Sequence, residues 1–202
     1  MLQPYILVLY YSKHGSVAEM AKHIARGAKQ LGSIDVIIRQ VPEIRDVTQE
    51  AQTQIPDEGA PFCTQEELAG CSGLALGSPS YFGGIASPLK HFIDQTSIVW
   101  MSGQLANKPA SVFTSASTMH GGQEMCLQAL MMPLFHHGML IHGLSYKSPA
   151  LHKTQTGGTP YGASHFAAST GSTTLSEDEI TLCHAQGLQL AKLSNALHDL
   201  DK

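Results

Sequence analysis

Residues 5–20, "YILVLYYSKHGSVAEM", indicate the fold class. Its first seven residues form a near-continuous apolar and aromatic run, which is typical of a strand buried on both faces of a parallel sheet. From Val17 onward apolar residues recur at helical spacing as far as Leu31, and Gly32 ends the pattern. A buried strand that leads directly into a helix is the opening unit of an α/β fold.

The same alternation continues along the chain and predicts a three-layer α/β protein. Because crossovers between parallel strands are right-handed, the helices cover both faces of the sheet. With five strands, the flavodoxin-like order 2-1-3-4-5 is the natural arrangement. Strands are expected at 5–11, 34–41, 72–79, 109–117 and 139–145, and the later helices at 64–68 onward, 87–96, 122–137 and 176 onward.

Length and composition favour one domain over residues 1–202. A Pro-rich segment at about 42–63 is expected to be an insertion or surface loop, and a Gly/Ser/Thr-rich segment at about 146–175 a long loop. The net charge of −4 argues against a nucleic-acid partner. The four cysteines form no CxxC pair, and no HExxH motif occurs, so no metal site is expected. Without a signal-like or membrane-spanning stretch, a cytoplasmic protein with no integral membrane segment is expected.

Three segments should meet at the carboxyl edge of the sheet, where such folds bind ligands. "SKHGSV" (12–17) is rich in hydroxyls and enters a helix N-terminus, a ready site for a phosphate. It carries neither GxxxxGK[ST] nor GxGxxG, so a terminal monophosphate suits it better than a pyrophosphate. "SPSYFGG" (78–84) offers aromatic rings, and "SASTMHGG" (115–122) offers small residues that can pass beneath a flat ligand.

Each of these segments also has a plainer interpretation. Ser12 or Ser16 is a helix cap in that interpretation, and Tyr81 and Phe82 pack into the local core. The third segment alone resembles any strand-to-helix turn. Together, however, a phosphate loop and surfaces for a planar ring predict FMN as the ligand.

The chain resembles the WrbA family of FMN-dependent NAD(P)H:quinone oxidoreductases, a branch of the flavodoxin-like proteins. The segments that carry this resemblance span nearly the whole chain. They are "VLYYSKHGSVAEMA", "GSPSYFGG", "LKHFIDQTSIVWMSGQLANKPASVFTSAS", "HGGQE", "LFHHGML" and "GGTPYGA".

The resemblance implies a set of site residues and a homotetramer with active sites at subunit boundaries. His136 would be the catalytic residue near the flavin ring, and Trp100 and His14 would bind the quinone or nicotinamide substrate. His14 stands where many members have tyrosine, and Tyr81 where arginine is common. The FMN contacts would be Ser12, Lys13, His14, Gly15, Ser16 and Val17 at the phosphate, Ser80, Tyr81 and Phe82 at the ring, and Ser115, Ala116, Ser117, Thr118, Met119, His120 and Gly121 at its pyrimidine side, together with His136.

The implied reaction is a ping-pong reduction of quinones to hydroquinones. NADH or NADPH delivers a hydride to flavin N5, and a quinone then takes two electrons from the flavin. Two alternatives are a one-electron flavodoxin-type carrier and a non-catalytic FMN-binding regulatory protein. His136 also fits a helix C-terminus, where the dipole favours a histidine, and Trp100 also fits a core or interface aromatic.

Overall fold

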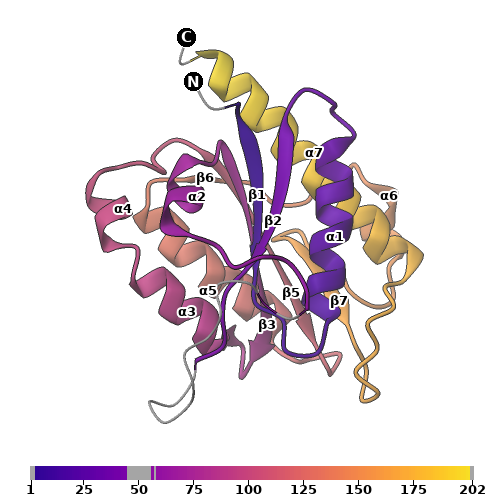
Figure 1. Cartoon of the computed structure of the whole chain (residues 1–202). Helices are drawn as coiled ribbons and strands as arrows, with labels where there is room; N and C mark the ends of the chain where they lie inside the picture. Colours follow the sequence, from indigo (N-terminus) through magenta and orange to yellow (C-terminus); the bar gives the residue numbers. More distant parts are fainter. Residues whose placement is uncertain (1–2, 45–55, 57, 201–202) are drawn as a thin grey trace.

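The computed structural model describes residues 3–44, 56 and 58–200 as a parallel sheet between two layers of helices (Figure 1). The order of strands across the sheet is β2 (Asp35–Gln40), β1 (Tyr5–Tyr10), β3 (Gly73–Tyr81) and β5 (Pro109–Ala116). Two short strands share the fifth position, beside β5. All of these neighbours pair in parallel. The predicted flavodoxin-like order is therefore confirmed.

The fifth position of the sheet is divided between two short strands. β6 (Leu140–Ile141) pairs with the first residues of β5, and β7 (Ala163–Phe166) pairs with its last four. The strand expected at 139–145 is thus only two residues long. The 146–175 segment, expected as a loop, contains α6 (Pro149–Lys153) as well as β7.

The helices cover both faces of the sheet, as expected. Figure 1 shows α1 (Ser16–Lys29) and α7 (Glu177–Leu200) side by side on one face. α2 (Gln65–Gly70), α3 (Ser87–Asp94), α4 (Ser97–Met101) and α5 (Gln123–His136) lie on the other. Each face has its own apolar core, because β1 alternates Ile6 and Val8 toward one side with Leu7 and Leu9 toward the other.

Two glycines allow α1 and α7 to pack closely. A Cβ at Gly27 would clash with the backbone of His184, and one at Gly187 would clash with the carbonyl oxygen of Ile24. These positions therefore need a residue without a side chain, although neither glycine has an unusual φ.

Capping residues set the starts of α2 and α7. Thr64 and Glu67 form a reciprocal capping box on α2. Ser176 and Glu179 bond each other's backbone N–H in the same way on α7. α3 begins at Ser87, as expected, with Ala86 in the cap position.

The insertion expected at about 42–63 lies largely outside the described residues. Its end is visible, where Phe62 forms a parallel bridge with Gln40 at the end of β2. Among the helices that the structure describes, none combines the length and apolar character needed to cross a membrane.

Candidate functional site

A cavity of about 240 Å³ opens at the carboxyl edge of the sheet, between the ends of β1, β3 and β5. It brings together ten of the residues expected at the site. Gly15, Phe82 and residues 118–121 do not line it. The lining residues are Ser12, Lys13, His14, Ser16, Val17, Pro79, Ser80, Tyr81, Ser115, Ala116, Ser117, Ala167 and Gly171.

The N-terminus of α1 presents free hydrogen-bond donors to this cavity. Gly15 is the cap residue, in a left-handed conformation with φ 91°. The Ser12 hydroxyl oxygen accepts hydrogen bonds from the N–H groups of Gly15 at 3.1 Å and Ala18 at 3.2 Å. The N–H groups of Ser16 and Val17 have no partner within the described part of the chain. Ser12 therefore acts as a cap, while two backbone donors stay available for an anion.

Two other polar side chains of this loop are already engaged. Ser16 is buried, and its hydroxyl donates to the carbonyl oxygen of Ser172 at 3.2 Å. Lys13 forms an ion pair of 2.7 Å with Glu43, and the hydrogen bond to that carboxylate raises the pKa of Lys13. Both bonds hold the loop in place, so the first contact with an anion falls to the backbone and Ser12.

The second loop is a tight hairpin that exposes aromatic rings. β3 turns back through Phe82 and Gly83 into β4 (Gly84–Ile85), and both turn residues have positive φ, 53° and 76°. Two successive positive φ angles characterise type I′ turns, where a bulky residue is unusual. The Phe82 side chain is fully exposed and that of Tyr81 is 42% exposed. A strained, solvent-facing aromatic beside a cavity is typical of a functional position.

The second and third loops approach each other through glycine backbone. Ser80 donates a hydrogen bond to the carbonyl oxygen of Gly121 at 2.7 Å. Gly122 caps α5 with φ 76°, and a Cβ there would lie 2.7 Å from the Cα of Gly83. These contacts hold the second and third loops together at the edge of the sheet.

A fourth segment also lines the cavity, which the sequence did not reveal. Ala167 and Gly171 follow β7, whose carboxyl end lies at the same edge of the sheet. The segment carries no motif of its own. The pairing of β7 with β5 places this segment at the cavity. A strand as short and polar as β7 gives no clear sequence pattern, so the sequence did not predict it.

Trp100 and His136 lie together but not in the first cavity. They share a second cavity of about 470 Å³ between α3, α4 and the C-terminal end of α5. The indole nitrogen of Trp100 donates to the carbonyl oxygen of His136 at 2.8 Å. Gly122 caps the opposite end of α5, a 14-residue helix about 21 Å long. Within one chain, the predicted catalytic histidine is therefore separated from the cofactor cavity.

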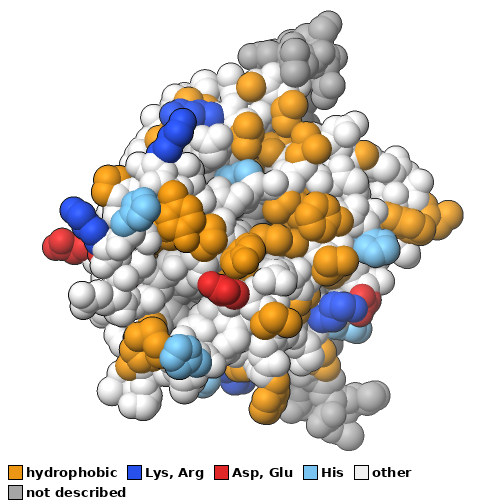
Figure 2. Space-filling view, turned by 180° about the vertical axis from the view of Figure 1, so that it is seen from behind, with side chains coloured by type: hydrophobic (Ala, Val, Ile, Leu, Met, Phe, Trp, Pro, Cys, Tyr) orange, Lys and Arg blue, Asp and Glu red, His pale blue; other side chains and the backbone are white. Residues whose placement is uncertain are grey.

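Exposed apolar side chains surround this second cavity. Figure 2 shows hydrophobic side chains gathered across the middle of the face opposite to the view of Figure 1. Exposed large hydrophobic residues are frequent on α4, α5 and β6. They are Ile98, Trp100, Met101, Met125, Met132, Phe135 and Leu140.

No cluster of three or more His, Cys, Asp or Glu residues that could hold a metal ion occurs in the part of the chain covered by the structure. The four cysteines are buried thiols, and burial raises the pKa of each. The first cavity instead fits FMN. The unpaired N–H groups of Ser16 and Val17 suit its phosphate, and Ser80, Tyr81 and the small residues 115–117 line the part of the cavity where its ring would lie.

The doubly wound sheet with an anion-ready loop after its first strand defines a flavodoxin-like protein. A WrbA-like flavodoxin-family protein from Agrobacterium tumefaciens is 20% identical, with TM-score 0.65 over 96% of this chain and 98% of that one. A flavodoxin from the domain Archaea is 15% identical, with TM-score 0.60 over 95% and 99%. Flavodoxin 1 from Bacillus cereus is 17% identical, with TM-score 0.59 over 93% and 97%.

The family model described as NADPH-dependent FMN reductase matches residues 4–149. The chain belongs to this family. Membership supports FMN-dependent oxidoreduction with NAD(P)H as the general activity of the protein.

Proposed function

We propose that the protein reduces quinones to hydroquinones with NADH or NADPH through bound FMN, as the WrbA family does. The observation that carries this proposal is the first cavity, where unpaired N–H groups at the N-terminus of α1 lie beside an exposed aromatic hairpin. FMN bound there would supply the redox chemistry, taking a hydride from the nicotinamide and passing two electrons to the quinone.

The chain's own residues bind and orient the cofactor in this proposal. Ser12 and the N–H groups of Ser16 and Val17 hold the phosphate. The backbone of 115–117, which lines the cavity, would lie along the ring, where N–H groups can stabilise negative charge in the reduced flavin. Tyr81 and Phe82 at the open side leave room for a flat substrate. Tyr81 supplies no fixed positive charge, so electrostatic preference for either nicotinamide nucleotide is weak at this position.

We infer that the substrate side of the site is completed by another subunit. In their own chain Trp100 and His136 line the second cavity and not the first. A homotetramer would cover the apolar face around α4 and α5 and bring this pair to a neighbour's cofactor. His136 would then donate a hydrogen bond to the ring or to a quinone oxygen, and His14 would contact the nicotinamide nucleotide.

Anaerobic reduction tests the proposed reaction. Purified holoprotein should lose its flavin absorbance on addition of NADH or NADPH and regain it on addition of benzoquinone. Steady-state turnover with benzoquinone, compared with free FMN as acceptor, then tests the quinone assignment. If neither nucleotide bleaches the bound flavin, the enzyme proposal is wrong, and a carrier or regulatory protein is the better interpretation.

A further inference from the structure

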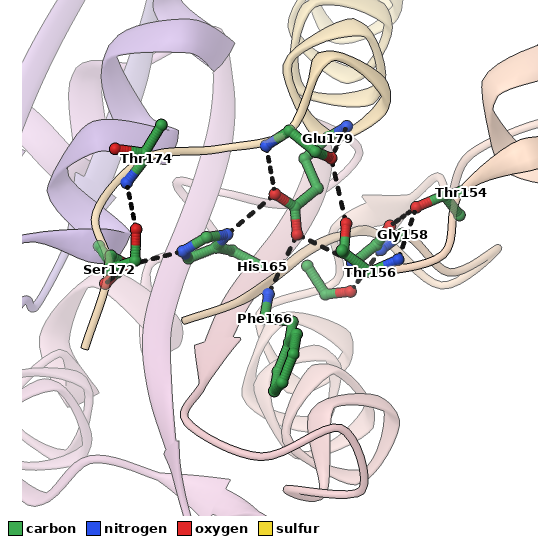
Figure 3. Close-up of polar contacts among 12 residues, drawn as sticks. Thr154, Thr156, Gly158, His165, Phe166, Ser172, Thr174 and Glu179 are labelled. Carbon is green, nitrogen blue, oxygen red and sulfur yellow. Dashed lines mark hydrogen bonds and ion pairs between the residues drawn. The ribbon is translucent and has the colours of Figure 1, made fainter. Parts of the chain in front are cut away.

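A buried ion pair lies directly behind the cofactor cavity. His165 of β7 and Glu179 of α7 are each 1% exposed, with imidazole Nδ1 and carboxylate Oε2 2.9 Å apart. The other ring nitrogen, Nε2, lies 2.9 Å from the carbonyl oxygen of Ser172. Figure 3 shows the His165 ring held between these two partners.

The hydrogen bonds around Glu179 favour an ionised carboxylate. Oε1 accepts from the N–H groups of Gly157 at 2.8 Å and Phe166 at 3.0 Å, and Oε2 accepts from Ser176 at 2.8 Å. Burial by itself would raise the pKa of this carboxyl, but the bonds from His165 and the backbone outweigh it and lower the pKa to about 2.

The partners of His165 in turn require a doubly protonated ring. A carbonyl oxygen and an ionised carboxylate can only accept, so both ring nitrogens must donate. Burial disfavours the charge, yet the bonds to Glu179 and Ser172 prevail and raise the pKa of His165 above its ordinary value. A buried imidazolium without a solvent contact is costly unless both of its N–H groups are satisfied, as they are here.

The Ser172 carbonyl connects this pair to the cavity. The same oxygen accepts the hydroxyl of Ser16, in the first turn of α1. Ser172 N–H donates to the carbonyl oxygen of Ala167 at 2.8 Å, closing a turn whose members Ala167 and Gly171 line the cavity. A charged donor at His165 therefore anchors residues 167–173 and the start of the phosphate loop through one shared acceptor.

We propose that His165 is a positioning residue of the cofactor site, whose charged ring holds residues 167–173 against the N-terminus of α1 and thereby sets the affinity for FMN. The inference rests on the proposed function, because it takes FMN as the ligand of the cavity. His165 lines no part of the cavity itself and acts through Ser172 and Ser16.

The groups around the imidazolium leave its charge under the control of Glu179. On α7, the other titratable neighbour is the buried Cys183 thiol, whose pKa is raised by burial and by Glu179. On β5, the register partner of His165 is the uncharged Ser115, and from α1 the uncharged Ser16 bonds its acceptor. Lys13 and His14 face the cavity from the first loop. These other groups remain in a His165 variant, so comparison with wild type isolates the histidine.

Titration of the apoprotein with FMN, followed by quenching of flavin fluorescence, tests the inference between pH 6.5 and 9.5. His165→Gln can satisfy only one of the two acceptors with a neutral donor. It should weaken FMN binding about tenfold at pH 6.5, the effect of one charged hydrogen bond. Glu179→Gln should weaken it similarly. The control is His142→Gln, which removes a partly buried histidine directly after β6, the other short strand that pairs with β5. This variant should leave the affinity for FMN unchanged.

The pH profile separates positioning by charge from simple loss of a structural residue. The phosphate is already mostly a dianion above pH 7, since its second pKa is about 6. The affinity of the wild type for FMN should fall as the pH rises and His165 loses its proton. The affinity of His165→Gln for FMN should stay constant over the same pH range. The rate of FMN release from wild-type holoprotein, which needs no variant, should rise over the same pH range.

Equal affinities and parallel pH profiles for wild type and His165→Gln would overturn the inference. So would a wild-type release rate that does not change with pH, if the variant fails to fold. Failure of the proposed function gives a different result, because wild-type apoprotein would then bind no FMN at any pH.

Discussion

Trp100 donates its indole N–H to the backbone carbonyl of His136 at 2.8 Å, joining α4 to the C-terminal end of α5. The bond fixes the ring over a cavity that lies apart from the one at the sheet edge. Two residues expected at a single active site thus form a separate surface in each chain. Their role in substrate binding and the role of the first cavity in cofactor binding can be tested independently.

We expect Trp100→Ala to affect the quinone and not the cofactor. Removal of the ring should raise the KM for benzoquinone roughly five- to thirtyfold, the range expected when about 1–2 kcal/mol of aromatic contact is lost. FMN affinity should remain within twofold of wild type, because Trp100 is not part of the first cavity. Trp100→Phe, which keeps an aromatic ring but loses the bond to His136, should lie in between. A loss of FMN affinity with unchanged KM would contradict this assignment.

Ser12→Ala should weaken FMN binding. The hydroxyl oxygen accepts two backbone N–H groups of the α1 N-terminus, and its own proton is available to a phosphate oxygen. A lost hydrogen bond to a charged group is worth roughly 1.5–3 kcal/mol, so the Kd should rise tenfold or more. Ser33→Ala, whose hydroxyl lies at the other end of α1 beside Asn195, is the matched control and should bind FMN normally. Fluorescence titration of both apoproteins gives the comparison.

Gly122→Ala should cost both stability and cofactor affinity. An alanine at this position must keep an unfavourable positive φ, and its Cβ would lie only 2.7 Å from the Cα of Gly83. Gly103→Ala is a matched control, since its φ is 65° and no atom lies within 4 Å of the added carbon. The control should lose about 1–2 kcal/mol of unfolding free energy, the cost of the left-handed backbone alone. Gly122→Ala should lose more unfolding free energy than the control, as measured by urea denaturation. It should also bind FMN more weakly than the control, as measured by fluorescence titration.

Stability should depend on pH through His165 and Glu179, with opposite signs. The pKa of Glu179 is lowered to about 2, so its stabilising contribution is present above about pH 4.5 and is lost as the pH falls toward 2. The pKa of His165 is raised, so its contribution is present below about pH 6.5 and is lost as the pH rises through the folded-state pKa. The difference in unfolding free energy between wild type and Glu179→Gln should therefore be largest between these limits. A difference that is constant from pH 3 to pH 9 would be incompatible with a charged pair.

Gly187→Ala should destabilise the protein without altering the site. The added methyl group would clash with the carbonyl oxygen of Ile24 and force α7 away from α1, and overpacking of this kind costs about 1–3 kcal/mol. Lys192→Ala, on the exposed side of the same helix, should change stability by less than about 0.5 kcal/mol. Thermal unfolding of the two apoproteins measures the difference.

The alternation of strands and helices could be predicted from the sequence, as could the strand-to-helix turn at residues 12–17. Strands buried on both faces must be continuously apolar, as in residues 5–11, so they are visible without a structure. The starts of α2 and α7 were visible for a similar reason, because capping boxes act within four residues. Such features depend only on neighbours along the chain.

The position of β7 and the cavity that each predicted residue lines depend instead on tertiary contacts. β7 is polar, and its burial is possible because Gln186 of α7 accepts from Ala163 N–H while Glu179 satisfies Phe166 and His165. These partners are more than ten residues away along the chain, so no local pattern reports them. The separation of His136 from the first cavity is likewise tertiary, because the C-terminal end of α5 lines the second cavity and no residue of α5 lines the first.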